Sequence, residues 1–448
     1  FVPRLFCENP LGYKGALVFI FMQFVINSVL YGQTCAIKLI LFSKGATFSD
    51  QSKLSLTDYP YSFIFLISPF LDRYFFKCLG RSKTYFIPIS LILAWMCLQW
   101  GSQLDTLIDN KEIDTLLVLL FAMGVAIAIL GSVGNAWVLT LFEDEDQRAA
   151  GVTFLMVGQT VGTMIGYNLF IPLNDVDWIN TYLVSDPVKK PFLTNQIMCY
   201  FSAILLLGQA LFSLFFVQER SIRGTNEGMT LGDVYLLFPK HFKNPHMRKL
   251  IFYIFGSSFL MYSVKRAFDL DLVNNGYMNM SRSTVSNIDT IISPLLLLAS
   301  LSTVYFMKSG QLVRMFHLTQ AFMTFLCVFQ YYTYMDLINN RELGRATAAR
   351  VFAGLLNFDF SSYFMLAYFN MIVVERFANT ELACLACLMD QSLTLSTTFG
   401  FWVLDYYDLP IYAPIVLILQ GVILILLFPY SKILDKKDPA LYNRLIQI

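Results

Sequence analysis

The stretch that decides the fold is PFLDRYFFKCLGRSK, residues 69–83. It joins two apolar segments that are each long enough to cross a membrane. The connection concentrates charge around a turn glycine, in Asp72, Arg73, Lys77, Gly80, Arg81 and Lys83. Cations gathered at the end of a span mark the cytoplasmic side. The aspartate can pair with basic residues at helix ends of the opposite half and lock the bundle on that side, whereas a plain positive-inside anchor would need only the cations.

The composition is that of a protein with many membrane spans. Of the 448 residues, 56% are hydrophobic and only 14% are charged, whereas soluble domains carry about 25% charged residues. The net charge of +1 gives no bias toward nucleic acid, so the expected surroundings are membrane lipid. The chain begins with Phe1 rather than methionine, and we expect that residues precede it. Cys384 and Cys387 form a C-x-x-C inside an apolar segment, and we interpret them as small core residues.

Twelve apolar segments reach the length of about 20 residues that a spanning helix needs. We expect them at residues 15–42, 57–76, 84–103, 115–141, 149–171, 195–216, 249–272, 284–306, 313–335, 347–374, 380–404 and 411–430. The sequence therefore predicts an all-α integral membrane protein.

The predicted spans form two sets of six on either side of a charged linker, the layout of two parallel repeats. The predicted domains are an N-terminal six-helix bundle at 1–217, a linker at 218–248, a C-terminal six-helix bundle at 249–430 and a polar tail at 431–448. The termini and the loops after even-numbered spans carry most of the 32 lysines and arginines. This bias predicts the termini and the linker on the cytoplasmic side, or on the matrix side of a mitochondrion. Residues 229–249 of the linker predict a short interfacial helix, interrupted by Pro239 and Pro245.

Small residues mark one face of the span at 149–171. Gly158, Gly162 and Gly166 recur every four residues, a spacing that lets another helix approach closely. Packing alone would explain these glycines. Asn135 and Gln159 lie among small residues in two neighbouring spans, and polar side chains inside a span usually face the bundle interior or a cavity. We therefore expect both side chains in a substrate pathway.

Several stretches together resemble the acetyl-coenzyme A transporters of the major facilitator superfamily. Beside residues 69–83, the likeness over about the first 170 residues is carried by ILFSKGATFSDQ at 40–51, YPYS at 59–62, QLDTLIDN at 103–110, AWVLT at 136–140 and VGQTVG at 157–162. Weaker pieces follow, LVNNG at 272–276 and WVLD at 402–405. The resemblance implies a twelve-span major facilitator fold of two six-helix bundles. It also implies a small anionic substrate similar to acetyl-CoA and a location in the endoplasmic reticulum.

The same resemblance brings out departures among the polar residues of the pathway. The altered positions are Ile64 (a lysine in the family), Gly131 and Asn135 (acids), Leu155 (an asparagine), and Lys265 and Asp271 (opposite sign). Charges inside a membrane are costly and are usually kept for function. Their loss indicates either a different substrate or no transport at all.

A few charged and polar residues remain inside the predicted spans. Lys265 and Arg266 could face an anion such as a coenzyme phosphate, or could pair with Asp269 in their own helix. Asp359 and Asp390 could relay a proton or could be held by hydrogen bonds within the bundle. The candidate substrate-binding residues are Asn135, Gln159, Lys265, Arg266, Asn357, Asp359, Asp390 and Gln391.

The sequence supports two functions. The first is a transporter that moves an anionic coenzyme or related metabolite across an organelle membrane by alternating access. The second is a transport-inactive subunit of a larger membrane complex, for example in the mitochondrial inner membrane, which the missing charges favour. A third, a receptor-like sensor, has no specific support. A working transporter should keep a midplane cavity lined by the polar set, and an inactive one should fill it with side chains such as Ile64 and Leu155.

Enzymatic chemistry has no signature in the sequence. There are three histidines, and none is expected in a span interior. No phosphate-binding glycine loop, metal-ligand spacing or nucleophile motif is present. We therefore expect no enzyme activity, no cofactor and no metal.

Overall fold

The computed structural model describes residues 12–44, 53–76, 78–141, 145–216, 230–236, 243–274, 311–339, 360–373, 377–404 and 407–435, together with a few single residues between them. This described part consists of helices and their connections and contains no strand. The all-α prediction is therefore confirmed.

The described N-terminal half contains five helices of membrane-spanning length and several shorter helical segments. Its elements are α2 (Gly12–Leu30), η1 (Tyr31–Cys35), α3 (Ala36–Ser43), η2 (Ser55–Asp58), α5 (Tyr59–Arg73), α6 (Arg81–Asp109), α7 (Ile113–Leu141), α8 (Glu145–Thr163), η3 (Met164–Leu169), α9 (Phe170–Leu173), α10 (Val176–Tyr182) and α11 (Asn195–Phe216). The first and fifth spans each contain a π-helical segment, η1 and η3, which hydrophobicity does not reveal. The short helix α10 was not predicted either.

The linker and the C-terminal half contain α12 (Leu231–Tyr235), α14 (Pro245–Asn274), α16 (Leu312–Asn339), α18 (Phe360–Ile372), α19 (Ala378–Leu404) and α20 (Leu409–Asp435). In the linker, α12 begins with a capping box between Thr230 and Asp233, and the Tyr235 hydroxyl donates a hydrogen bond to the main-chain oxygen of Leu66. The predicted span at 284–306 and the first part of the span at 347–374 lie almost entirely outside the described residues.

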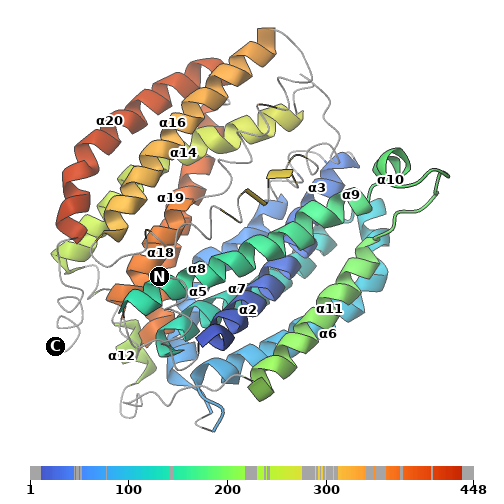
Figure 1. The fold of residues 1–448 in the computed structure, drawn as a ribbon, viewed down its shortest axis with the longest axis horizontal. Coiled ribbons are helices and arrows are strands. Elements are labelled where there is room, and N and C mark those ends of the chain that lie inside the picture. Colours follow the sequence, from blue (N-terminus) through green and yellow to red (C-terminus); the bar gives the residue numbers. More distant parts are fainter. Residues whose placement is uncertain are drawn as a thin grey trace.

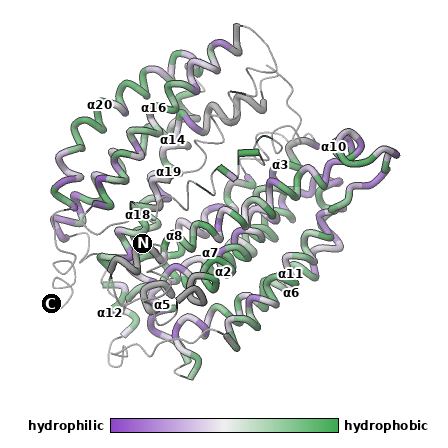
Figure 2. Tube along the Cα trace, viewed as in Figure 1, coloured by the Kyte–Doolittle hydropathy of each residue, from purple (hydrophilic) through white to green (hydrophobic). Residues whose placement is uncertain are grey.

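Seven helices of the described part are long and apolar enough to cross a membrane by length and composition. They are Leu17–Leu41, Arg81–Asp109, Ile113–Trp137, Gly151–Leu173, Asn195–Phe215, Leu312–Asp336 and Leu409–Asp435. Hydrophobic residues run along the whole length of these helices (Figure 2). Many large apolar side chains lie exposed on α11 and α20, such as Phe215 and Ile425. A bilayer is the solvent that suits such faces, so the protein is an integral membrane protein.

The helices form two bundles that meet at one end (Figure 1). The helices α2, α5, α6, α7, α8 and α11 make one bundle, and α14, α16, α18, α19 and α20 make the other. Contacts between the bundles are made by α5 with α19, α7 with α19 and α8 with α18. The two bundles run apart toward the end that carries α10. We call the two ends of the molecule the Asp72 end and the α10 end.

Glycine allows the closest helix contact of the N-terminal bundle. A Cβ atom added at Gly162 would lie 2.6 Å from the Phe24 main-chain oxygen and 2.9 Å from Asn27 Cβ. Added Cβ atoms at Gly158 and Gly166 would collide with the main-chain oxygens of Ile20 and Ser28. The glycine face of α8 and η3 therefore lies directly against the backbone of α2, which places the first and fifth spans side by side.

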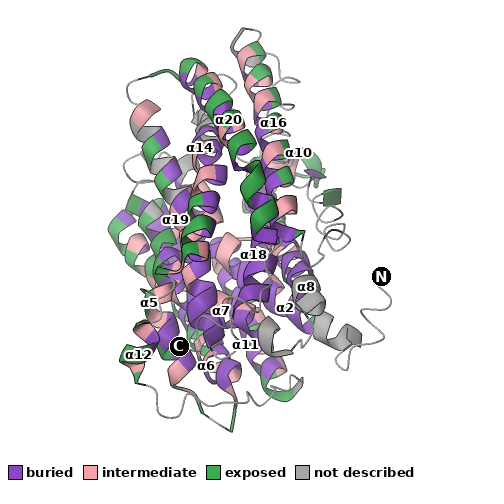
Figure 3. Ribbon diagram, turned by 90° about the vertical axis from the view of Figure 1, so that its left-hand side faces the viewer, coloured by how far each residue is buried: buried purple, intermediate pink, exposed green. Residues whose placement is uncertain are grey.

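In the side view, the buried residues are concentrated in the central helices (Figure 3). The central helices are largely buried, whereas the outward faces of α16, α19 and α20 include many exposed residues. One apolar cluster joins Ala136 and Met156 of the N-terminal bundle to Leu250, Phe369 and other residues of the C-terminal bundle. This cluster closes the Asp72 end of the interface with apolar packing.

Candidate functional site

The Asp72 carboxylate is the centre of a buried polar contact between the two bundles. Asp72 lies in the last turn of α5 and is 0% exposed, and Arg81, the first residue of α6, is 2% exposed. Arg81 Nη1 lies 3.2 Å from Asp72 Oδ1. The loop between them is short because Gly80 adopts a φ of 90°, a conformation that residues with a side chain rarely adopt.

The opposite bundle contributes the start of α19 to the same carboxylate. The main-chain nitrogen of Thr380 and its hydroxyl both donate to Asp72 Oδ2 at 2.7 Å. Asn379 donates to Oδ1 through Nδ2 at 2.8 Å and through its main-chain nitrogen at 3.3 Å. The first turn of a helix carries unpaired N–H groups and a positive partial charge, so a buried carboxylate is well matched there. We call this set, Asp72, Arg81, Asn379 and Thr380, the lock.

Two other charged residues of the 69–83 stretch stay within the N-terminal half. The Arg73 guanidinium lies 5.5 Å from the centre of the Tyr74 ring. Lys83 Nζ donates to the main-chain oxygen of Leu214 at 3.3 Å, which joins the start of α6 to the end of α11. Lys77 lies outside the described residues. Among the contacts of the described residues of this stretch, those of Asp72 reach the other bundle.

The contact between α5 and α19 continues toward the middle of the molecule. Cys387 Sγ donates to the Ser62 main-chain oxygen at 2.7 Å, and both residues are buried. One turn further along α19 lies Asp390, which is half-buried, as is its neighbour Gln391. The Tyr61 hydroxyl is buried with no hydrogen-bond partner, and Asp390 is among its electrostatic neighbours. We call this contact between α5 and α19 the seam. Polar groups lie at its end nearest the middle of the molecule.

A second polar group lies inside the N-terminal bundle. Asn27 Nδ2 donates to Gln23 Oε1 at 3.0 Å, and Gln23 Nε2 donates to Asn135 Oδ1 at 3.3 Å. Gln23 and Asn27 are buried, whereas Asn135 is half-buried. Gln159 is also half-buried, on α8. The structure therefore places Asn135 at the accessible end of a hydrogen-bonded chain.

The candidates in the C-terminal bundle are described only in part. Lys265 is 4% exposed, and its ammonium lies 5.1 Å from the centre of the Tyr262 ring. Arg266 follows it on α14, but its side chain is outside the described set. Asn357 and Asp359 also lie outside the described residues. Lys265 is therefore a buried cation and does not present an open charged surface.

The positions that depart from the family pattern differ in how closely other residues pack around them. Ile64 and Leu155 are 6% and 4% exposed and belong to one apolar cluster, which also includes Ala383 of the opposite bundle. In contrast, a Cβ atom added at Gly131 would meet no atom within 4 Å. Space thus remains at one altered position and is filled at two others.

One histidine expectation is wrong. His317 was expected outside the span interiors, yet it is buried in α16 with its Nδ1 3.0 Å from the Tyr253 hydroxyl. The Tyr253 ring stacks on it, and the Phe428 ring lies at a tilt beside it. A single polar ring satisfied by one hydroxyl and two aromatic neighbours is a packing unit. Among the described residues, no group of three His, Cys, Asp or Glu side chains could hold a metal ion.

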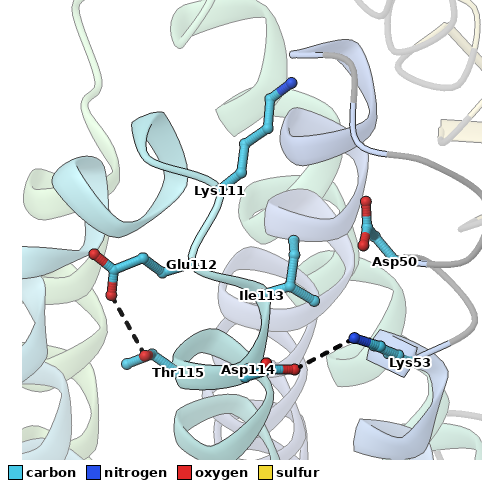
Figure 4. A pocket seen from close by; sticks show the side chains of 7 residues that line it. All are labelled: Asp50, Lys53, Lys111, Glu112, Ile113, Asp114 and Thr115. Atoms are coloured by element: carbon cyan, nitrogen blue, oxygen red, sulfur yellow. Dashed lines mark hydrogen bonds and ion pairs between the residues drawn. The ribbon is translucent and has the colours of Figure 1, made fainter.

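A charged depression lies on the surface at the α10 end (Figure 4). It is lined by Asp50, Lys53, Lys111, Glu112, Ile113, Asp114 and Thr115. Lys53 Nζ lies 3.6 Å from Asp114 Oδ1, and the Thr115 hydroxyl donates to Glu112 Oε2 at 3.4 Å. Charges of both signs alternate there, so the depression offers no concentrated charge for a ligand.

Known proteins relate to this chain by sequence over part of its length. A family model described as acetyl-coenzyme A transporter 1 matches residues 17–231. An uncharacterized protein of Schizosaccharomyces pombe is 24% identical over 183 residues, and an uncharacterized membrane protein of Saccharomyces cerevisiae is 24% identical over 196 residues. Each of these two matches covers 40% of this chain and only 35% of the relative.

Solved structures relate to the chain over nearly its whole length. The human organic anion transporter MFSD10 has a TM-score of 0.62 at 12% identity and covers 94% of this chain and 99% of its own. The E. coli fucose:proton symporter FucP has a TM-score of 0.60 at 12% identity, covering 95% and 98%. FucP in the outward conformation has a TM-score of 0.58 at 11% identity, covering 94% and 98%. The chain has the major facilitator fold, and its N-terminal half is related to the acetyl-coenzyme A transporters.

The sequence pointed to Asp72 but not to its partners. Asn379 and Thr380 begin the eleventh span, and nothing in the sequence links two small polar residues there to a loop 307 positions earlier. Gln23 and Asn27 were similarly missed as supports of Asn135. Their spacing of four along one predicted helix was the available signal, because residues four apart share a helix face.

Proposed function

We propose that this major facilitator protein is a transporter that moves an anionic coenzyme or related metabolite across an organelle membrane by alternating access. The observation that carries the proposal is the lock. It joins the two bundles at one end through a single carboxylate and the first turn of α19, with distances of 2.7 to 3.3 Å. The family match over residues 17–231 supports a coenzyme A ester as the substrate.

The lock suits alternating access because hydrogen bonds and an ion pair can be broken and remade as a unit. While it holds, the Asp72 end is closed and the other end is free to admit substrate. When the bundles rock the other way, Asp72 loses the first turn of α19 but keeps Arg81, which lies in its own bundle. The carboxylate therefore retains a cation in both states, which lowers the cost of separating the bundles.

The substrate contacts that we propose lie between the lock and the α10 end. Asn135 and Gln159 would contribute from the N-terminal bundle, and Asp390 and Gln391 from the seam with α19. Lys265 and Arg266 would balance negative charge on the substrate, and Asn357 and Asp359 are proposed as further contacts from the sequence alone. All eight remain proposals that mutagenesis has to test.

Uptake into liposomes tests the transport function. Purified protein in liposomes preloaded with unlabelled coenzyme A should take up labelled acetyl-CoA faster than protein-free liposomes. A double variant, Gly131→Asp with Asn135→Asp, puts back the acids that the family resemblance implies at these two positions. Uptake by this variant but not by the native chain would indicate a protein that has lost transport and kept the fold. A correctly folded native chain that moves no coenzyme A ester would contradict the proposal.

A second candidate, a transport-inactive subunit of a larger membrane complex, has one specific observation in its favour. Ile64 and Leu155, which stand where the related transporters carry polar residues, are packed into an apolar cluster. Such a protein would migrate with other subunits when native membranes are solubilised in mild detergent and run on a native gel. Migration as a single chain from the endoplasmic reticulum would favour the transporter. Migration within a large complex from the mitochondrial inner membrane would favour the subunit.

A further inference from the structure

A chain of three carboxamides fixes the direction of the Asn135 side chain. Asn27 Nδ2 donates to the Gln23 main-chain oxygen at 2.9 Å as well as to Gln23 Oε1 at 3.0 Å. A main-chain oxygen can only accept, so the NH₂ group of Asn27 must face Gln23. Gln23 then accepts through Oε1 and donates through Nε2. Its acceptor at 3.3 Å is Asn135 Oδ1.

The consequence is that Asn135 has a spare donor and an occupied acceptor. Its Oδ1 atom receives Gln23, while both hydrogens of Nδ2 remain for another partner. Because Gln23 and Asn27 are buried, neither amide can turn over without losing its own bonds, which would leave buried polar groups unsatisfied. Asn135, which is half-buried, therefore presents N–H groups and not a carbonyl.

Open space lies one helical turn away on α7. Residues four apart on a helix share a face, about 6 Å apart, so Gly131 and Asn135 are neighbours. No heavy atom lies within 4 Å of the Cβ position of Gly131. The two hydrogens of Asn135 Nδ2 therefore lie beside a vacant volume.

We propose that Asn135 and the space over Gly131 form a subsite for an oxygen-rich, hydrogen-bond-accepting group of the transported molecule. A phosphoryl oxygen or an amide carbonyl of a coenzyme has this chemistry. An ammonium group is a poorer match, because Asn135 offers it only the second lone pair of Oδ1, the first being taken by Gln23. The subsite rests on the proposed transport function. It adds that, at one contact, the protein donates a hydrogen bond and the substrate accepts it.

Cysteine labelling tests the subsite directly. Gly131→Cys protein in liposomes would be treated with a membrane-impermeant thiol reagent, with the native chain as background. The matched controls are Gly208→Cys and Gly421→Cys, because these glycines also have no atom within 4 Å but lie between lipid-exposed residues such as Leu211 and Ile418. We expect Gly131→Cys to react at least tenfold faster than either control, and acetyl-CoA, which has no free thiol to consume the reagent, to slow that reaction at least tenfold. Asn135→Asp, added to Gly131→Cys, should raise the acetyl-CoA concentration for half-protection at least tenfold.

The outcomes separate the subsite from the proposed function. Fast labelling with protection by acetyl-CoA supports both. Fast labelling without protection, while the native chain still takes up coenzyme A esters, overturns the subsite and leaves the transporter standing. Labelling without protection and without any uptake overturns both. Labelling no faster than the two control glycines shows that Gly131 faces no aqueous space, and overturns the subsite whatever the uptake.

Discussion

At the scale of single residues, the Asp72 carboxylate is fully buried, and a cation and hydrogen bonds offset the cost of burying its charge. A buried carboxylate is costly unless a cation and hydrogen bonds satisfy it, and Asp72 receives four hydrogen bonds from α19 and an ion pair from Arg81. The sequence predicted an aspartate that would reach the other bundle. It could not predict the partners, because an N-terminal helix turn is identified by position in space and not by residue type.

Removal of the Asp72 charge should destabilise the protein measurably. Asp72→Asn keeps the size of the side chain but leaves the buried Arg81 without this carboxylate. Breaking a buried pair in this way costs about 3–5 kcal/mol of unfolding free energy. The control is Asp114→Asn, which breaks the exposed pair with Lys53 and should cost less than about 1 kcal/mol. Thermal unfolding in detergent measures both, and equal melting temperatures for the two variants would argue against the lock.

The residue type at a position does not tell whether neighbouring side chains fill the space beside it. The sequence named Ile64 and Leu155 as side chains that could fill a cavity, and both are buried in an apolar cluster. Gly131 belongs to the same set of altered positions yet faces open space. Whether a position is filled depends on the distance to the neighbouring helix, which a single sequence does not encode.

At the scale of elements, the glycine face of α8 determines how the N-terminal bundle is packed. The four-residue spacing predicted close approach of some helix, and the structure shows that this helix is α2. The π-helical segments η1 and η3 lie beside each other at the far end of the same pair. Local widening of a helix leaves no mark in hydrophobicity, so these two segments were not predicted.

A single methyl group should be enough to disturb this pair. Gly162→Ala places Cβ 2.6 Å from a main-chain oxygen of α2, and a backbone cannot move aside as a flexible side chain can. Overpacking of this kind costs roughly 1–3 kcal/mol. In Gly208→Ala the new methyl group meets open space, so helix propensity should make it neutral or slightly stabilising. If denaturation in detergent shows no loss of stability for Gly162→Ala, α2 and α8 are not packed as closely as described.

At the scale of the whole molecule, hydrophobicity and charge were enough to predict the fold class. Runs of apolar residues indicated the spans, and the charged linker indicated two bundles, which agrees with solved major facilitator structures over 94% of the chain or more. The relative placement of the bundles was beyond the sequence. It depends on a few contacts, such as the lock and the bond from Cys387 to Ser62, that join residues distant in the chain.

The central claim is that the two bundles must separate at the Asp72 end for transport to occur. The most direct measurement is uptake of labelled acetyl-CoA by a Ser62→Cys variant, which adds a thiol at the residue whose main-chain oxygen lies 2.7 Å from Cys387 Sγ across the seam. With the Ser62→Cys to Cys387 disulfide verified by mass spectrometry, uptake should stop under oxidising conditions and return when a reductant is added. The native chain treated identically is the control. Undiminished uptake by the fully cross-linked variant would contradict the account.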